Sequence, residues 1–303
     1  MSSDGTSSGP FSDAQPGGLP QPADPVAAAQ AEQRRQQALE ALQVLDSDAE
    51  AAFDGLVQAA AAICGTPIAL ISLIDQERQW FKANMGLEGL SETPRAISFC
   101  THVIEQPDLF VVEDARLDAR FASNPLVTGD PHIRFYAGAP LQLASGAAVG
   151  TLCVIAREPL QLNPHQRQVL RQLGHTAVHL LEGRRALLAE AELRQEAERI
   201  NSGMPIGLYA VNAEGSCTFT NARWQEIFGL GLEESLGSGW SDTLHPDDRA
   251  GVFTEWMQSV EQEREVQMGF RVLHRDGKVL HVRSQAKTLR DGTGAITGFL
   301  GFA

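Results

Sequence analysis

The strongest constraint on the fold comes from residues 133–155, where two runs of β-forming residues flank a short turn. The turn is the Ala-Ser-Gly-Ala-Ala segment at residues 144–148, and this arrangement predicts a β-hairpin. The second run, residues 149–155, is almost wholly apolar. A strand without polar alternation has both faces covered, so we expect a central strand that is buried on both sides.

Length, charge and hydropathy limit the classes to which the chain belongs. Its 303 residues are enough for two domains of ordinary size. The formal net charge of -14 argues against a nucleic-acid-binding protein, because phosphates bind to basic faces. The longest apolar runs, residues 68–74 and 149–155, are far shorter than the roughly 20 residues that span a bilayer. Since the N-terminus also lacks the features of a secretion signal, we expect no membrane segment and a cytoplasmic location.

Composition divides the first half of the chain into segments. Residues 1–27 are rich in Ser, Gly, Pro, Asp and Gln, which predicts a disordered tail. Residues 28–45 are good helix formers and predict a helix. The Asp-Ser-Asp segment at residues 46–48 caps a second predicted helix over residues 49–64, which carries one apolar stripe. Strands and loops follow, and complete a first domain over residues 28–163.

A long helix is predicted over residues 164–202, with Asn163 as its cap. Its apolar residues recur at spacings of three and four over residues 170–191, and Arg184 occupies one of these positions. This pattern is the seam of a coiled coil and predicts a parallel homodimer, in which Arg184 weakens the seam and helps to fix its register. The alternative is a helix that packs on its own domain. That alternative explains the first part of the helix but leaves its charged remainder with no surface to cover.

Several segments of the first domain follow one another as they do in a known family. They are residues 66–75, 78–83, 92–95, the Ser-Phe-Cys-Thr-His run at 98–102, residues 112–115, and then Asp118, Arg120 and Phe121. Together with the predicted hairpin, they resemble a GAF domain. This resemblance covers roughly half of the chain, and it implies a fold that senses a small molecule or a redox state.

The remaining third of the chain reads as a second domain over residues 203–303. Residues 207–212 and 216–221 predict two strands, and residues 265–302 predict three more, joined by two Asp-Gly turns. The Asn-Ala-Arg-Trp run at residues 221–224, the Ile-Phe-Gly run at 227–229 and the His-Pro-Asp-Asp-Arg run at 245–249 resemble a PAS domain, here truncated in its last strand. The predicted fold class is therefore α+β, with two domains that each contain a central antiparallel sheet flanked by helices, joined by a long coiled-coil-type helix.

The GAF resemblance implies a ligand pocket beside the Ser-Phe-Cys-Thr-His run. In this interpretation Arg120 or Arg134 pairs with an anionic ligand. A structural alternative pairs Asp114 with Arg120, to hold the loop between them. The candidate pocket residues are Cys100, His102, Asp114, Arg120, Arg134 and Tyr136.

The four cysteines have no Cys-x-x-Cys spacing, so we expect reduced thiols, with neither a metal site nor a disulfide framework. Cys100 lies close to His102, which leaves a thiolate nucleophile and a bilin attachment site as alternatives to simple pocket lining. Some GAF domains are free methionine sulfoxide reductases, whose cysteines must meet in space. Here Cys64 ends a helix, Cys153 lies in a buried strand and Cys217 belongs to the other domain, so we interpret each as a small core residue.

The sequence therefore predicts the sensory and regulatory module of a bacterial signal-transduction protein. It binds a small ligand or senses redox state, and passes the signal through a dimeric helix to an output domain or a partner protein. The resemblance implies a histidine kinase of a two-component phosphorelay, or a diguanylate cyclase, as the output. Because the sequence contains neither, we expect a fragment or a truncated sensor. No catalytic residue, cofactor or metal is assigned, and the alternatives are a stand-alone thiol enzyme of the methionine sulfoxide reductase type and a dimerisation scaffold without a ligand.

Overall fold

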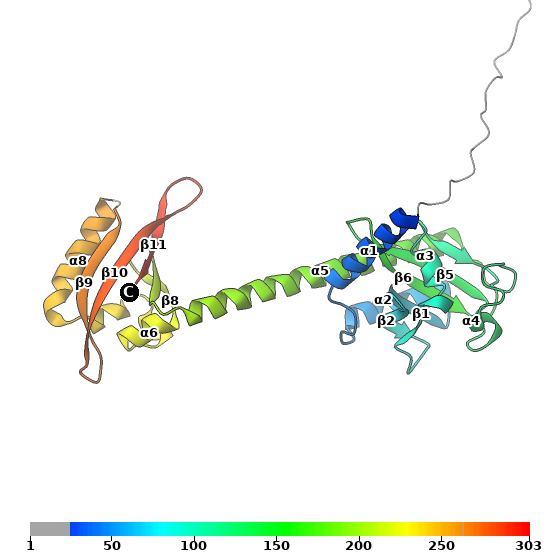
Figure 1. Ribbon diagram of the computed structural model, residues 1–303, viewed down its shortest axis with the longest axis horizontal. Coiled ribbons are helices and arrows are strands. Elements are labelled where there is room, and N and C mark those ends of the chain that lie inside the picture. Colours follow the sequence, from blue (N-terminus) through cyan, green and yellow to red (C-terminus); the bar gives the residue numbers. More distant parts are fainter. Residues whose placement is uncertain (1–24, 263) are drawn as a thin grey trace, which may run out of the picture. The chain divides into compact units, whose positions relative to one another are not determined.

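The computed structural model describes residues 25–303 except residue 263. The chain divides into two compact units, with the boundary between Leu188 and Ala189. This boundary lies inside one continuous helix, α5 (Pro164–Gly203), as Figure 1 shows. Each unit contains one antiparallel sheet flanked by helices, so the predicted fold class is confirmed. Residues 1–24 of the predicted tail lie outside the described residues, and residues 25–27 form the first turn of a helix.

The first unit is a six-stranded antiparallel sheet with the strand order β3-β2-β1-β6-β5-β4. Its elements before α5 are α1 (Pro25–Ala41), α2 (Ala51–Cys64), β1 (Ile68–Ile74), β2 (Arg78–Met85), β3 (Glu92–Pro94), η1 (Arg95–Ile97), α3 (Cys100–Val103), β4 (Phe110–Val112), α4 (Pro125–Thr128), β5 (Phe135–Gln142) and β6 (Ala148–Ala156). The predicted hairpin is formed by β5 and β6, which pair in antiparallel register.

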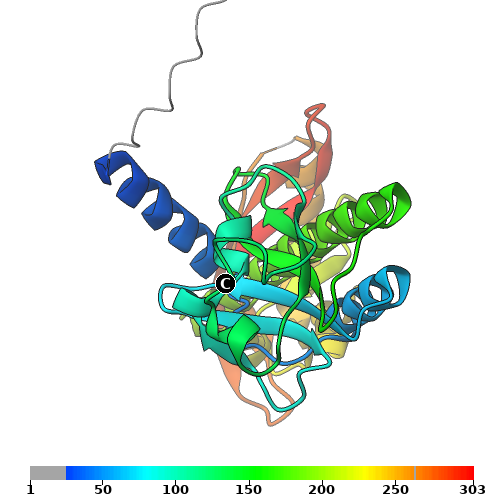
Figure 2. The same cartoon turned by 90° about the vertical axis from the view of Figure 1, so that its right-hand side faces the viewer.

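Strand β6 lies near the middle of the sheet, between β1 and β5, and its side chains alternate between two cores. Leu152 and Val154 face the core that is covered by α2 and α5, which lie side by side in Figure 2. Cys153 and Ile155 face the opposite core, which is covered by α3 and α4. Because both faces are covered, the prediction of a central strand buried on both sides is confirmed.

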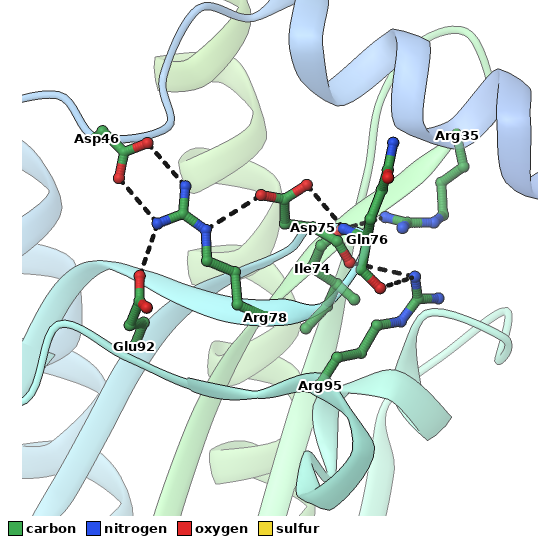
Figure 3. Close-up of polar contacts among 8 residues, drawn as sticks. All are labelled: Arg35, Asp46, Ile74, Asp75, Gln76, Arg78, Glu92 and Arg95. Atoms are coloured by element: carbon green, nitrogen blue, oxygen red, sulfur yellow. Dashed lines mark hydrogen bonds and ion pairs between the residues drawn. The ribbon is translucent and has the colours of Figure 1, made fainter.

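Polar contacts connect α1 and the segment between α1 and α2 to the turn between β1 and β2 (Figure 3). Arg78 pairs with Asp46 at 2.7 Å and with Glu92 at 2.6 Å. From α1, Arg35 donates a hydrogen bond of 2.8 Å to the backbone carbonyl of Ile74. These contacts hold α1 and the chain that follows it against the sheet.

The N-terminal part of α5 packs on the first unit. Leu170 and Ala177 are buried in the core beneath it. Further along, Arg184 forms an ion pair with Glu50 at 2.9 Å and donates a hydrogen bond of 2.7 Å to the backbone carbonyl of Gln43. Arg184 thus contacts its own domain, which corrects its predicted place in a dimer seam. The physical reason is local, because the carbonyls that end α1 and the carboxylate before α2 offer the guanidinium group partners within reach.

The second unit is a five-stranded antiparallel sheet with the strand order β8-β7-β11-β10-β9. Its elements are β7 (Leu208–Asn212), β8 (Cys217–Thr220), α6 (Ala222–Phe228), α7 (Leu232–Ser235), η2 (Gly239–Thr243), α8 (Pro246–Glu261), β9 (Val266–Leu273), β10 (Val279–Arg290) and β11 (Ile296–Phe302). Gly277, in the predicted Asp-Gly turn between β9 and β10, has a φ of 85°, a left-handed conformation that favours glycine.

Helix α6 places aromatic side chains in the second core. The side chain of Asn221 accepts a hydrogen bond of 2.9 Å from the backbone N–H of Trp224 and caps the helix. Trp224 stacks on Phe228 with ring centroids 3.8 Å apart, and Phe228 contacts Phe270 of β9 at 6.2 Å between centroids. The cap and the stacked pair therefore fix how α6 meets the sheet.

Candidate functional site

Cys100 is the first residue of α3 and lies against the central strands of the first sheet. Its side chain is buried. Its Sγ lies 3.1 Å from the hydroxyl oxygen of Tyr136 on β5, and 4.0 Å from the Sγ of Cys153 on β6. Of the predicted pocket residues, Cys100 and Tyr136 are therefore in direct contact.

Cys153 lies in the core as expected, but its contact with Cys100 was not expected from the sequence. The register of the sheet pairs Cys153 with Gly138, and the side chain of Tyr136 occupies the space that Gly138 leaves open. A Cβ added at Gly138 would lie 2.6 Å from the Tyr136 hydroxyl, so only glycine lets that hydroxyl reach the thiols. Cys64, in contrast, belongs to the core on the other face of the sheet.

The two neighbouring thiols differ in acidity. Burial raises the pKa of Cys100, but hydrogen bonds from Cys153, Tyr136 and nearby hydroxyls outweigh burial and lower it to about 7. The hydrogen bond to Cys100, together with burial, raises the pKa of Cys153 well above its usual value. Burial likewise raises the pKa of Tyr136, which stays a neutral donor. Cys100 is therefore the thiol that ionises, and Cys153 keeps its proton.

Buried polar side chains continue from the thiol pair across the sheet. Ser72 and Thr151 pair across β1 and β6, and both are fully buried. Gln79 donates a hydrogen bond of 3.2 Å to Ser72 and accepts one from the hydroxyl of Ser98. The Thr151 hydroxyl has no hydrogen-bond partner. The Ser72 hydroxyl helps to stabilise the ionised sulfur of Cys100 and so to lower its pKa.

Aromatic side chains pack around this polar group. Phe99 stacks on Phe121 with ring centroids 4.1 Å apart, and its centroid lies 5.2 Å from that of Tyr136. Phe110 meets Phe121 edge-on at 6.1 Å. All four rings are buried. The region in which the GAF resemblance implies a ligand is thus filled by packed rings in this conformation.

His102 and Arg120 lie around the outer side of these rings. The imidazole of His102 meets the ring of Phe121 edge-on at 5.0 Å. The guanidinium group of Arg120 lies 4.7 Å from the ring centroid of Phe110 and pairs with Asp118 at 2.6 Å. That ion pair lowers the pKa of Asp118 and already compensates the charge of Arg120.

The other two predicted pocket residues have separate partners. Asp114 pairs with Arg116 at 2.7 Å, so the predicted pair between Asp114 and Arg120 is wrong. The reason is local, since each of these residues meets an oppositely charged side chain two positions away. Arg134 donates a hydrogen bond of 2.8 Å to the backbone carbonyl of Val127. A role in ligand binding for the six residues stays a prediction.

The second unit contains an apolar cavity that the sequence analysis did not predict. Its volume is about 40 Å³. Three of the four tryptophans of the chain lie within residues 224–256, and this clustering is the signal that could have indicated it. The aromatic and sulfur-containing side chains that line the cavity include Trp224, Phe228, Trp240, Trp256, Met268 and Phe270.

One polar contact interrupts the apolar wall of this cavity. The hydroxyl of Tyr209 on β7 lies 2.8 Å from the hydroxyl of Ser284 on β10. Burial raises the pKa of Tyr209, so its hydroxyl stays neutral. Ligand pockets usually measure about 300–1,000 Å³. A space of about 40 Å³ therefore admits only a very small molecule unless the aromatic side chains move.

The described part of the chain, residues 25–262 and 264–303, contains neither a candidate metal site nor a candidate membrane span. No group of three or more His, Cys, Asp or Glu side chains in those residues is placed to hold a metal ion. Likewise, none of the helices in those residues has the length and apolar character needed to cross a membrane.

Comparisons with known proteins identify both units. A family model described as GAF domain matches residues 48–181, and a second, described as PAS fold, matches residues 218–303. A cyclic di-GMP phosphodiesterase of Pseudomonas aeruginosa is 42% identical over 178 residues, which are 59% of this chain and 28% of that enzyme. An uncharacterized protein of Sinorhizobium fredii is 28% identical over 116 residues, which are 38% of this chain and 14% of that protein. The chain thus spans less than a third of the length of these curated relatives.

Solved structures with similar parts include two PAS-containing proteins. The PAS domain of a protein from Colwellia psychrerythraea is 20% identical to the matched part of this chain, with a TM-score of 0.33. The match covers 36% of this chain and 92% of that structure. The second structure is the N-terminal domain of a diguanylate cyclase with a PAS/PAC sensor from Marinobacter aquaeolei. It is 20% identical to the matched part of this chain, with a TM-score of 0.30, and the match covers 32% of this chain and 91% of that structure. The two family matches thus show that the chain contains a GAF domain followed by a PAS fold.

Proposed function

We propose that the chain is the sensory and regulatory module of a bacterial signal-transduction protein. Its two domains belong to sensory families, and α5 runs without interruption from the first unit into the second. The 42% identical relative is a cyclic di-GMP phosphodiesterase, which favours an enzyme of cyclic di-GMP turnover as the output domain. A histidine kinase is the alternative output that the sequence resemblance implies.

The cavity in the PAS fold is the observation that carries this proposal. It is lined mainly by aromatic and other apolar side chains and offers one neutral polar pair, Tyr209 and Ser284. This combination suits a small apolar ligand with one hydrogen-bonding group. Because the cavity is only about 40 Å³, a larger ligand has to displace tryptophan side chains. Binding is then coupled to a change in the packing of the PAS core, as a sensor requires.

We further propose that α5 transmits the signal within a parallel dimer. Beyond Arg184 the helix exposes three large apolar side chains, Leu187, Leu193 and Ile200, at 69%, 74% and 50% of their surface. Leu193 and Ile200 are one heptad apart and therefore lie on one face of the helix. Burying this face against a second copy removes apolar surface from water, which supports a dimer through this part of α5.

The test of the ligand site is native mass spectrometry of the 303-residue chain purified from its own host, with a matched pair of variants. Val252→Phe fills the cavity, since Val252 lines it and is buried. Val279→Phe is the control, because Val279 on β10 does not line the cavity and is 43% exposed. We expect a bound small molecule on the wild type and the control, and none on Val252→Phe. A wild-type protein without a bound molecule would instead favour a dimerisation scaffold.

The contact between Cys100 and Cys153 supports a second candidate, a thiol enzyme that reduces free methionine sulfoxide. The burial of both sulfur atoms opposes it, because a substrate of that size cannot reach them without displacing packed rings. The test is turnover of free methionine sulfoxide by the wild type and by Cys100→Ser. Turnover that is lost in Cys100→Ser would support the enzyme, and its absence in both proteins would exclude it.

A further inference from the structure

We propose that Cys100 and Cys153 form a redox site that is oxidised to a disulfide by hydrogen peroxide. The site belongs to the GAF domain and uses neither the PAS cavity nor its ligand. It therefore gives the chain a second input, and this inference stands or falls independently of ligand binding.

The geometry of the two sulfur atoms supports this site. Their separation is 4.0 Å, and a disulfide bond needs about 2.05 Å, so they have to approach by about 2 Å. Cys153 is held in the sheet because β6 is paired with β1 on one side and β5 on the other. Cys100 begins a helix of only four residues. The movement is therefore expected from the Cys100 side chain and α3.

The side chains around Cys100 favour its reaction as a thiolate, the nucleophilic form of cysteine. Tyr136, at 3.1 Å from its sulfur, Cys153 and the hydroxyl of Ser72 stabilise the ionised sulfur. Cys153 stays protonated beside it and is placed to resolve the oxidised form of Cys100.

The buried hydroxyl of Thr151 is a second, independent indication of a reactant at this place. It is fully buried and has no hydrogen-bond partner. Buried polar groups are nearly always paired, so an unpaired one calls for an unseen partner such as a small polar molecule. Hydrogen peroxide is small, accepts and donates hydrogen bonds, and suits this position. The buried side chains of Ser98, Gln79 and Ser72 are linked by hydrogen bonds, and Ser72 is paired with Thr151 across the sheet.

The reaction balances in two steps. The Cys100 thiolate attacks one peroxide oxygen, the O–O bond breaks, and the leaving hydroxide takes up a proton to give water and a sulfenic acid on Cys100. The sulfur of Cys153 then loses its proton and attacks the Cys100 sulfur. The S–S bond forms as the S–O bond breaks, and a second water leaves. Two electrons from the pair of thiols have then reduced one peroxide to two waters.

The other two cysteines are internal controls within the same chain. Cys64 lies in the core on the opposite face of the sheet, and burial raises its pKa to about 11. Cys217 belongs to the second unit, and burial raises its pKa too. Neither has the set of donors that surrounds Cys100, so both are expected to stay reduced under mild oxidation.

The experiment exposes the folded 303-residue protein to a small excess of hydrogen peroxide at pH 7. Peroxide is removed with catalase before the protein is unfolded in N-ethylmaleimide and digested for peptide mass spectrometry. We expect a peptide that joins Cys100 to Cys153, lighter by two hydrogens than the reduced pair and reversed by dithiothreitol. Cys64 and Cys217 are expected to carry the maleimide label.

Three variants separate the steps. Cys153→Ser should stop at the sulfenic acid, which dimedone traps on Cys100. Tyr136→Phe should slow oxidation at pH 7 about fivefold, because loss of the hydroxyl is expected to raise the pKa of Cys100 by about one unit and so to lower the fraction of thiolate about fivefold. Cys64→Ser, the matched control, should form the joined peptide at the wild-type rate. Maleimide labels on both Cys100 and Cys153 of peroxide-treated wild type, or a disulfide that involves Cys64 or Cys217 instead, would overturn the proposal without any variant having to fold.

Discussion

Lys82 is the side chain on which we expect the first unit to depend most. It lies on β2, and its side chain is completely buried. Its Nζ donates three hydrogen bonds: one of 2.9 Å to the hydroxyl of Ser47, one of 2.6 Å to the backbone carbonyl of Asp48 and one of 2.7 Å to the carboxylate of Glu50. The ammonium group thus joins β2 to the segment that leads into α2, and Lys82→Met removes all three contacts while keeping most of the alkyl chain.

The expected loss of stability follows from these three bonds. A hydrogen bond to a charged group contributes about 1.5–3 kcal/mol, and the loss of one partner of a buried ion pair usually costs about 3–5 kcal/mol. Two effects reduce the sum here. Glu50 is 39% exposed and keeps its ion pair with Arg184 at 2.9 Å, so its carboxylate does not become an unpaired buried charge. Removal of the buried ammonium also ends its desolvation penalty. We therefore expect Lys82→Met to lower the free energy of unfolding by about 2–3 kcal/mol.

Scanning calorimetry of the full chain measures this loss in the transition of the first unit. A domain of this size loses about 2–4 °C per kcal/mol, so its Tm should fall by roughly 4–12 °C while the transition of the second unit stays in place. The control is Lys278→Met in the exposed turn between β9 and β10, for which we expect a change within about 0.5 kcal/mol. A loss below about 1 kcal/mol for Lys82→Met would refute the reasoning, because the three contacts would then contribute no more than an exposed ion pair.

Three further predictions follow from other parts of the structure. The double variant Leu193→Lys and Ile200→Lys should convert a dimer to a monomer in multi-angle light scattering, and a wild type that is already monomeric at micromolar concentration would contradict the dimer. Gly138→Ala should lower the free energy of unfolding by about 1–3 kcal/mol, because its Cβ would lie 2.6 Å from the Tyr136 hydroxyl, and unchanged thermal unfolding would argue against that contact. Hydrogen bonds from arginine side chains, first Arg35, lower the pKa of Glu32 in the folded protein. The contribution of ionised Glu32 to the free energy of unfolding is therefore complete above its unfolded pKa of about 4.3, and it is lost as the pH falls through the folded pKa. Between pH 5 and pH 2 the wild type should therefore lose more stability than Glu32→Gln, by up to about 1 kcal/mol because the Glu32 side chain is 40% exposed, and equal losses in a pH series of urea unfolding would contradict it.

Local sequence patterns were sufficient to predict several of the longer elements of this chain. The apolar run of β6, the Asp-Gly turn before β10 and the helix capped at Asn163 all depend on residues that are near neighbours in the sequence. Side-chain periodicity and turn chemistry act over a few residues, so these features can be recognised without a structure. The order of the motifs was then enough to indicate a GAF domain followed by a PAS fold.

Contacts between distant residues could not be derived in that way. Cys100 and Cys153 are 53 positions apart, and they meet only because of the register of β5 on β6 and the docking of α3. The cavity of the PAS fold depends on how side chains from four strands, two α-helices and the η2 segment fill a common space. Arg184 has the spacing of a seam residue, yet the carbonyls at the end of α1 and the carboxylate of Glu50 bind it. The sequence by itself determined the longer elements and their order, because these depend on short-range periodicity and turns. Only the tertiary structure decided which side chains meet, because register, packing and burial are properties of the whole folded domain.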